Sequence, residues 1–257
     1  MIVAALMLAS TLSCEGLPPA PPRAVEAGHA ALARFPSAGL ALVRIEAGDA
    51  VWAHYAGDAA PGRPADCETL FNVGSITKLM TAELTLLLAG AGEIDLDASI
   101  ADLVAHADLG ADPRYALLTP RLILSHQTGL LNWEHSYPDR KLAFTFDPGE
   151  GYSYSGAAYE LLAQYIEALT GGSFADLVQA RLLAPLGVEA YLGAAAAPSD
   201  HRVLPMNADG EFETFRPWEQ GPSAADNLFI SGPQLARFLT ASLAQDSEDG
   251  APRSTPL

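Results

Sequence analysis

The chain has 257 residues, of which 49% are hydrophobic and 18% are charged. This length is enough for one large domain or two small ones, and the hydrophobic content argues against intrinsic disorder. The 31 acidic and 14 basic side chains give a formal charge of −17. Such a negative surface repels phosphate groups, so nucleic acid and anionic lipid are poor candidate partners.

The N-terminus carries a continuous apolar run, Ile2–Leu12. The run is too short to span a bilayer, but it has the length of the hydrophobic region of a secretory signal. Ser13 and Cys14 follow, and the junction resembles a bacterial lipoprotein signal, in which the cysteine receives lipid. A buried first helix or strand is the alternative. The pattern predicts an exported protein of the periplasm or cell envelope, with Cys14 as the candidate for a lipid tether to the membrane.

Two cysteines, Cys14 and Cys67, allow at most one disulfide and no multi-cysteine metal site. If Cys14 is lipidated or removed, Cys67 is left as a lone thiol. The resulting domain plan is a signal peptide over residues 1–14, a Pro-rich tether over 15–22 and one folded domain over 23–257.

The elements predicted in chain order begin with a helix and a β-hairpin. The helix covers residues 23–34, and the hairpin strands cover 39–45 and 50–55 with Gly and Asp in the turn. The remaining elements are a short run at 70–73, a helix over 75–91, a mostly helical stretch from 94 to about 187, an irregular stretch over 205–222 and a helix over 233–244. Strands followed by a long helical block predict a mixed layer of sheet and helices with a helical insertion.

Gly74-Ser75-Ile76-Thr77-Lys78 is the most informative short motif. Three residues of helix place Ser75 and Lys78 on the same face. A serine hydroxyl becomes a nucleophile when a neighbouring base takes its proton, and a lysine amine can be that base. The first turn of a helix also directs backbone N–H groups toward a developing oxyanion. The alternative is a helix-capping serine followed by an exposed lysine.

A second segment, Phe146–Gly156, places a tyrosine between two serines. Tyr154 follows the Pro148-Gly149 turn and precedes a predicted helix over 157–169, so it is well placed to point into a cleft. A phenol near Lys78 can relay protons. The alternative for Tyr154 is an ordinary core tyrosine with a satisfied hydroxyl.

Five segments in this order resemble the serine β-lactamase-like family, which groups class C β-lactamases, D-alanyl-D-alanine carboxypeptidases and related esterases. They are LFNVGSITKLMTAELTLLL, ILSHQTGL, FDPGEGYSYSGAAYELLAQYIEALTG, LLAPLGV and SAADNLFISGPQLARFL. The resemblance implies an α+β fold of the β-lactamase/transpeptidase type, with an antiparallel sheet layer flanked by helices and a mostly helical lobe. It implies that Ser75 is the acylated nucleophile, Lys78 its base partner and Tyr154 the general base. His126 is expected to be a buried, hydrogen-bonded structural residue, and no metal or organic cofactor is implied.

The chain departs from the family pattern at the Tyr-x-Asn motif, which reads Tyr154-Ser155-Gly156 here. The Asn amide that would bond the acyl-amide side chain of a substrate is absent, and Gly156 stands at this substrate-binding position. The change favours esters or other small acyl substrates over penicillins.

The family's third motif, a Lys or His followed by any residue and Gly, is also missing. The sequence has no lysine after Tyr154. Its one histidine in that stretch, His201, is followed by Arg202-Val203, which lacks the glycine of the motif. We therefore expect a truncated copy or one part of a split reading frame, without the C-terminal strands. One edge of the hairpin should then be unpaired, and the isolated chain should turn over substrate weakly or not at all.

The leading interpretation is a serine hydrolase that forms an acyl-enzyme on Ser75 with a small-molecule ester or amide. The alternative is a weak or inactive family member that uses the same cleft to bind a cell-wall peptide or a partner protein. A zinc hydrolase is disfavoured because His126 and His135 are nine residues apart, without the spacing of paired ligands.

Overall fold

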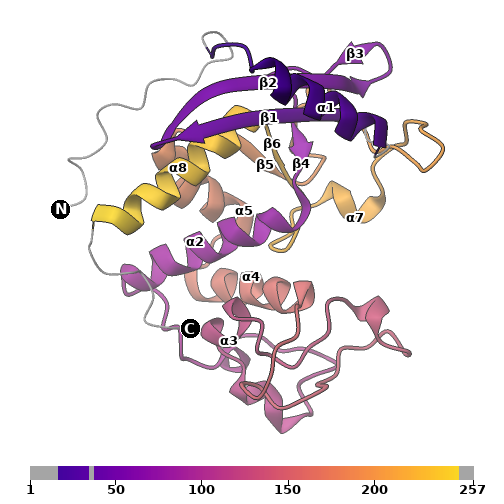
Figure 1. Ribbon diagram of the computed structural model, residues 1–257. Coiled ribbons are helices and arrows are strands. Elements are labelled where there is room, and N and C mark those ends of the chain that lie inside the picture. Colours follow the sequence, from indigo (N-terminus) through magenta and orange to yellow (C-terminus); the bar gives the residue numbers. More distant parts are fainter. Residues whose placement is uncertain (1–16, 35–37, 249–257) are drawn as a thin grey trace. The chain divides into compact units, whose positions relative to one another are not determined.

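The computed structural model describes residues 17–34 and 38–248 (Figure 1). Cys14 and the apolar run before it, on which the expectations of export and lipidation depend, lie outside these ranges. The helices are α1 (Pro22–Arg34), α2 (Thr77–Gly90), α3 (Pro120–Leu124), α4 (Gly156–Thr170), α5 (Phe174–Leu177), α6 (Ala184–Leu186), α7 (Pro217–Gln220) and α8 (Gly232–Glu248). The strands are β1 (Gly39–Glu46), β2 (Asp49–Ala60), β3 (Arg63–Pro64), β4 (Phe71–Asn72), β5 (Ala190–Leu192) and β6 (Leu228–Ile230).

The chain divides into two compact units. Of the described residues, the first unit contains those up to 73, 183–222 and 228–248, and it carries both sheets. The second unit contains 74–182 together with the short segment 223–227. The second unit therefore consists of one long stretch and one brief return of the chain.

The predicted hairpin is present in the first unit. β1 and β2 are antiparallel, with Gly39 opposite Gly57 and Glu46 opposite Asp49. The two turn residues, Ala47 and Gly48, have φ angles of 50° and 90°, the positive values that a tight two-residue hairpin turn needs. β2 continues to Ala60, beyond the predicted end.

α1 and α8 cover opposite faces of this hairpin. A Cβ atom on Gly28 of α1 would lie 3.0 Å from Leu40, whereas one on Gly232 of α8 would lie 3.2 Å from Ala41. Neighbouring residues of a strand point to opposite faces, so the two helices lie on different sides of β1. The predicted helices over 23–34 and 233–244 are thus confirmed and have defined packing roles.

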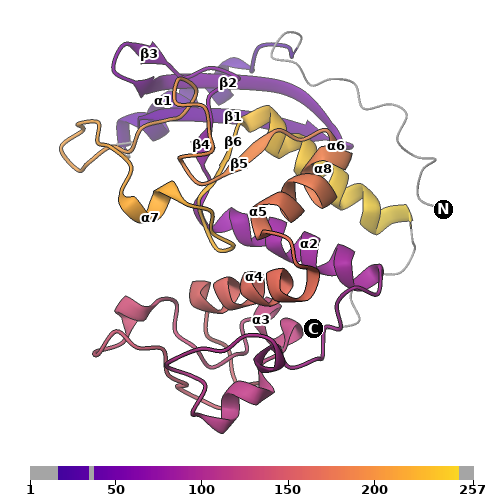
Figure 2. The same ribbon diagram turned by 180° about the vertical axis from the view of Figure 1, so that it is seen from behind.

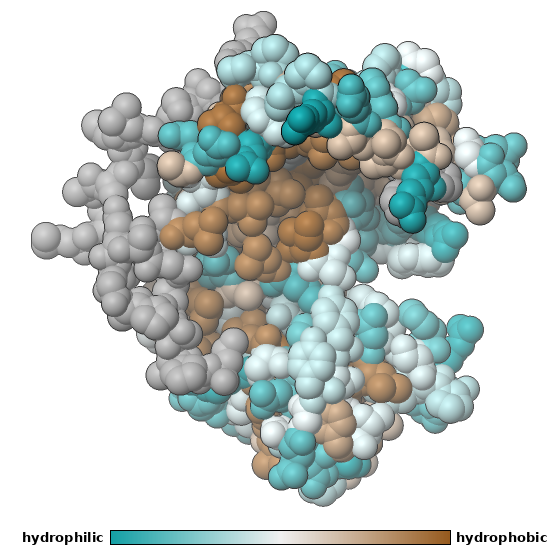
Figure 3. Space-filling view, in the orientation of Figure 1, coloured by the Kyte–Doolittle hydropathy of each residue, from teal (hydrophilic) through white to brown (hydrophobic). Residues whose placement is uncertain are grey.

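β1 is the edge strand of its sheet, whose order is β1-β2-β3. The unpaired edge expected from the sequence is therefore present among the described residues. Figure 3 shows a patch of hydrophobic residues in the upper middle of the face seen in this view.

A second small sheet has the order β4-β6-β5 (Figure 2). Phe229 of β6 lies opposite both Asn72 and Tyr191, and it is fully buried. It packs in a small apolar cluster with Leu70, Ala194 and Ala197. The sequence did not predict β5 or β6, because strands of three residues with consecutive apolar positions show no alternation.

The second unit is built on α2 and α4, which contact each other. Lys78, Thr81, Thr85 and Leu88 are among the buried residues of α2, and their spacing of three or four residues forms one buried face. α4 begins after Ser155, whose hydroxyl caps the N–H of Ala158 at 3.1 Å. The helix predicted over 157–169 is thereby confirmed.

Between α2 and α4 the helical segments are shorter than the sequence predicts. They are the 3-10 turns Ile100–Asp102, Pro113–Leu117 and Glu134–Ser136 and the single-turn helix α3. Two of them have a proline at their first position and a capping residue just before it. Asp112 caps the turn that starts at Pro113, and Thr119 caps the helix that starts at Pro120. These capping sequences start new turns repeatedly, and none extends into a long helix.

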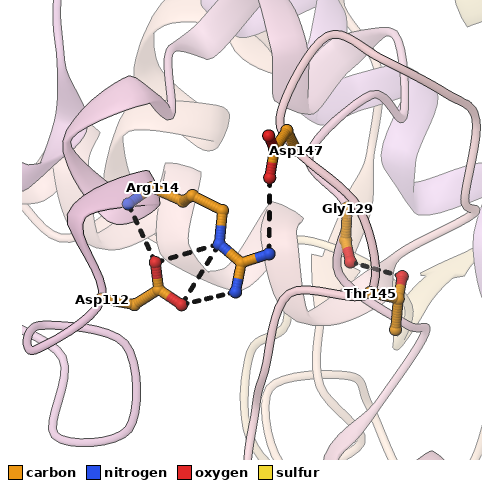
Figure 4. A network of polar contacts seen from close by, with 5 residues as sticks. All are labelled: Asp112, Arg114, Gly129, Thr145 and Asp147. Carbon is orange, nitrogen blue, oxygen red and sulfur yellow. Dashed lines mark hydrogen bonds and ion pairs between the residues drawn. The ribbon is translucent and has the colours of Figure 1, made fainter.

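Polar contacts fix the loops of this region (Figure 4). Arg114 donates hydrogen bonds to both carboxylate oxygens of Asp112, at 3.0 and 2.7 Å, and forms a longer ion pair of 3.5 Å with Asp147. These hydrogen bonds lower the pKa of Asp112. Thr145 donates to the carbonyl oxygen of Gly129 at 2.8 Å. The loop that leads to Tyr154 is thus tied to two earlier segments.

The remaining findings concern the predicted tether, Cys67 and the helices as candidate membrane spans. Pro19, within the predicted tether, forms an isolated bridge with Ala53 of β2. Cys67, in the turn before β4, is disulfide-bonded. Over residues 17–34 and 38–248, every helix falls short of the length and hydrophobicity that crossing a bilayer requires.

Candidate active site

Ser75 and Lys78 lie close together at the start of α2. Ser75 belongs to the 3-10 turn Gly74–Ile76, which leads directly into α2. The hydroxyl of Thr77 donates to the carbonyl oxygen of Gly74 at 2.6 Å and so fastens this turn. Lys78 Nζ lies 3.4 Å from Ser75 Oγ. The side-chain pair expected from the i, i+3 spacing is present, with the serine exposed and the lysine 6% exposed.

The ammonium group of Lys78 is held by one carbonyl and surrounded by aromatic rings. It donates a hydrogen bond of 2.9 Å to the carbonyl oxygen of Ala225. Nζ lies 4.7 Å from the ring centroid of Tyr154, 5.7 Å from that of Tyr159 and 6.0 Å from that of Trp133. Cations are attracted to ring faces at these distances. Burial raises the pKa of Tyr159 to about 12, so its phenol is neutral beside Lys78.

Tyr154 is presented by two chain segments, 126–132 and 145–157, which run side by side. The hydrogen bonds between them link Thr145 N to Gly129 O, Gly149 N to Gln127 O, Ser153 N to His126 O and Ala157 N to Asn132 O. The hydroxyls of Ser153 and Ser155 donate to Leu130 O and Leu131 O, each at 2.9 Å. Tyr154 lies between these two anchored serines and is 37% exposed. This arrangement explains why a tyrosine flanked by serines is held at a fixed place.

The imidazole ring of His126 packs against the ring of Tyr154. Its ring centroid lies 4.5 Å from that of Tyr154 and 5.3 Å from that of Tyr159. Its Nδ1 accepts a hydrogen bond of 3.2 Å from the backbone N–H of Ser155. Burial, with a smaller contribution from the positive charge of Lys78, lowers the pKa of His126. A neutral, hydrogen-bonded histidine fits the structural role that the family resemblance implies.

Gly156 adjoins a tryptophan that the sequence did not single out. A Cβ atom at position 156 would lie 2.4 Å from Cζ2 of Trp133. The backbone N–H of Gly156 donates to Asn132 Oδ1 at 2.8 Å, which keeps the segment in this close approach. The indole therefore fills the volume that a side chain at position 156 would need, and it adds apolar surface near Lys78.

The short segment 223–227 completes the surroundings of Lys78. Thr81 donates to Ala224 O at 2.6 Å, one helical turn from the contact between Lys78 and Ala225. On its other side, Ser223 donates a hydrogen bond to a carboxylate oxygen of Glu160 on α4. Burial raises the pKa of Glu160, while the hydrogen bonds from Ser223 and Ala224 act in the opposite direction.

The structure brings together the three predicted residues Ser75, Lys78 and Tyr154. It adds Trp133, Glu160 and Ala225, which sequence reasoning missed. Ala225 and Glu160 become neighbours of the site only through the fold. Trp133 could have been found from Gly156, because a glycine where the family has a larger residue leaves space for another side chain.

The folded units and the Ser-x-x-Lys pair beside a tyrosine define the β-lactamase/transpeptidase class of fold. The Beta-lactamase family model matches residues 29–255, so the chain belongs to the β-lactamase family of serine hydrolases. It is 28% identical over 201 residues to "Penicillin-binding protein 4" of Amycolatopsis lactamdurans, covering 66% of this chain and 50% of the relative. It is 31% identical over 186 residues to "Esterase EstB" of Burkholderia gladioli, covering 62% of this chain and 47% of the relative.

Among solved structures, a class C β-lactamase superposes with a TM-score of 0.72 at 20% identity, covering 87% of this chain and 66% of that one. This likeness confirms the predicted fold class. The chain spans about half the length of the curated relatives it matches.

Proposed function

We propose that this protein is a serine hydrolase that acts through an acyl-enzyme on Ser75, with a small-molecule ester or amide as substrate. The observation that carries the proposal is the position of Lys78 Nζ, 3.4 Å from Ser75 Oγ and 4.7 Å from the ring of Tyr154. A nucleophile and its base need to lie within or near hydrogen-bond reach, and such contacts are often long before substrate binds.

In the proposed reaction, the Lys78–Tyr154 pair begins with one site open for a proton, and the proton of the Ser75 hydroxyl passes to that site as Oγ bonds to the substrate carbonyl carbon. The carbon–oxygen or carbon–nitrogen bond of the leaving group then breaks, and the leaving group takes up that proton. Water next attacks the acyl carbonyl carbon on Ser75 and gives one proton to the same pair. The bond between that carbon and Oγ breaks, the acid leaves, and the pair returns the proton to Ser75 Oγ. Lys78, Tyr154 and Ser75 thus return to their starting protonation states.

Esters of small acyl groups suit this site better than penicillins. Because residue 156 is glycine, this position provides no side-chain amide for a polar acyl side chain of the substrate. The indole of Trp133 occupies the space beside it. The ester preference is also consistent with the printed name of one relative, "Esterase EstB".

Covalent labelling tests the proposal without a known substrate. The protein is incubated with a fluorophosphonate probe, its intact mass is measured, and the modified peptide is mapped. We expect one adduct at Ser75 that is absent in Ser75→Ala. Ser99→Ala, which alters a serine that caps a 3-10 turn, is the matched control and should label normally. A folded protein that takes up no probe at Ser75 would favour the alternative of a non-catalytic binding module.

A further inference from the structure

Glu160 is a carboxylate at a position where ionisation is costly. It lies on α4, partly buried, and desolvation raises its pKa despite its hydrogen bonds. Groups that carry such a cost are often retained at functional sites. Within the described part of the chain, its hydrogen-bond partners include Ser223 and the backbone N–H of Ala224. They belong to the segment 223–227, in which the carbonyl of Ala225 accepts a hydrogen bond from Lys78.

The contacts form a continuous chain from Glu160 to the nucleophile. The Ser223 hydroxyl donates a hydrogen bond to Glu160, and its oxygen accepts hydrogen bonds from the backbone N–H groups of Ala225 and Asp226 at 3.1 and 3.0 Å. These bonds fix the peptide whose carbonyl accepts from Lys78 Nζ at 2.9 Å.

The same segment is anchored to α2. Thr81 donates to Ala224 O at 2.6 Å. The backbone between Ser223 and Asp226 is thus held between α2 and α4, with Glu160 as the anchor on the α4 side. The ion pairs found within residues 17–34 and 38–248 do not include Lys78. Its orientation therefore depends on neutral acceptors, of which the Ala225 carbonyl is the nearest.

We propose that Glu160 is a positioning residue for Lys78: it holds Ser223 so that the carbonyl of Ala225 fixes the lysine ammonium beside Ser75. The proposal rests on the proposed function of Ser75 and Lys78. Glu160 does not touch the reacting atoms and acts through the 223–227 segment. Its loss should disturb Lys78 while leaving the two central helices in place.

The test uses the fact that the chain has two lysines, Lys78 and Lys141. With lysine labelled with carbon-13, the side-chain spectrum contains one ε-CH₂ signal from each residue, and Lys141→Arg assigns them. We expect Glu160→Leu and Ser223→Ala to move or broaden the Lys78 signal and leave that of Lys141 unchanged. Glu160→Gln keeps an acceptor for the Ser223 hydroxyl and should largely restore the wild-type spectrum. Gln164→Ala, an exposed change one turn along α4, is the matched control.

Labelling kinetics give a second readout. Glu160→Leu should slow acylation of Ser75 by the fluorophosphonate by about 10–100-fold, the cost of a misplacement of roughly 1 Å in a catalytic group. The effect should fall on the maximal rate of labelling more than on the probe concentration that gives half of it.

The proposal is overturned if a folded Glu160→Leu or Ser223→Ala variant has a Lys78 signal that superimposes on the wild type. If Glu160→Leu does not fold, Ser223→Ala decides by the same criterion. Absence of probe labelling in the wild type would count against the proposed function alone, because the lysine spectrum does not depend on catalysis.

Discussion

The indole of Trp133 occupies the place of a side chain at Gly156, since a Cβ atom there would approach it to 2.4 Å. Protein interiors are close-packed, and a contact this short requires one of the two groups to move. The pair Trp133–Gly156 therefore has to change together, although the two residues are far apart in sequence.

Gly156→Ala should destabilise the protein by about 1–3 kcal/mol, the usual cost of overpacking. Adding Trp133→Leu to Gly156→Ala should recover part of the loss, because the smaller side chain leaves room for the new methyl group. Thermal unfolding of the single and double variants measures both effects. Gly172→Ala is the control, since a Cβ at Gly172 meets its neighbours at no less than 3.5 Å. Equal melting temperatures for Gly156→Ala and the wild type would contradict the geometry.

Lys78→Ala should slow acylation of Ser75 by the fluorophosphonate by about 10²–10⁴-fold, the range for removal of a general base. Tyr154→Phe keeps the ring over Nζ and removes the hydroxyl, so a loss in that variant reports proton transfer and not packing. Lys141→Ala changes the other lysine and should label at the wild-type rate. Labelling of Lys78→Ala at an unchanged rate would remove this residue from the mechanism.

The lowered pKa of His126 predicts how stability depends on pH. The folded protein keeps this imidazole neutral, whereas the unfolded chain takes up a proton below about pH 6.5. The stabilising contribution is therefore complete above that pH and is lost as the pH falls toward the lowered pKa. Melting temperatures should decline over this acid range in the wild type.

His126→Asn should flatten that decline. Asparagine tolerates the φ of 56° found at this position, and its Oδ1 can accept the N–H of Ser155 in place of Nδ1. His135→Asn, at an exposed histidine, is the control and should retain the wild-type slope. Parallel curves for wild type and His126→Asn would show that His126 does not govern the acid branch.

The unpaired edge of β1 predicts self-association. Arg44 and Glu46 form an ion pair of 3.2 Å on this strand, with each side chain 57% exposed, and charges on an edge strand discourage pairing with another chain. Arg44→Thr with Glu46→Thr should therefore increase association, measured by sedimentation velocity at several concentrations. Removal of the surface ion pair Glu93–Arg181 by the same substitutions is the matched control. A double Arg44/Glu46 variant that stays monomeric at every concentration would contradict the prediction.

The sequence predicts the elements that depend on local pattern. The hairpin follows from its turn residues, and the pair Ser75–Lys78 follows from helical spacing. The helices α1, α4 and α8 also follow from composition and breakers. The capped turns before α4 are shorter than the mostly helical stretch that the sequence predicts from 94 to about 187, because the turns that begin at Pro113 and Pro120 each end within five residues.

The rest of the site depends on contacts between distant residues. Ala225 lies 147 positions beyond Lys78, and alanine carries no side-chain chemistry that would mark its carbonyl as a ligand. Glu160 has the sequence context of a helix surface residue, and its role emerges only when Ser223 is brought beside it. Strands β5 and β6 are specified by their pairing and not by an alternating pattern.

The brief return of the chain at 223–227 limits how the protein can be dissected. A fragment that ends at residue 182 would contain Ser75, Lys78, Tyr154 and Glu160, yet it would lack the carbonyl that receives the lysine ammonium. Minimal versions of this helical unit therefore require a grafted copy of Ser223–Asn227, joined by a linker, before their chemistry can be compared with that of the intact chain.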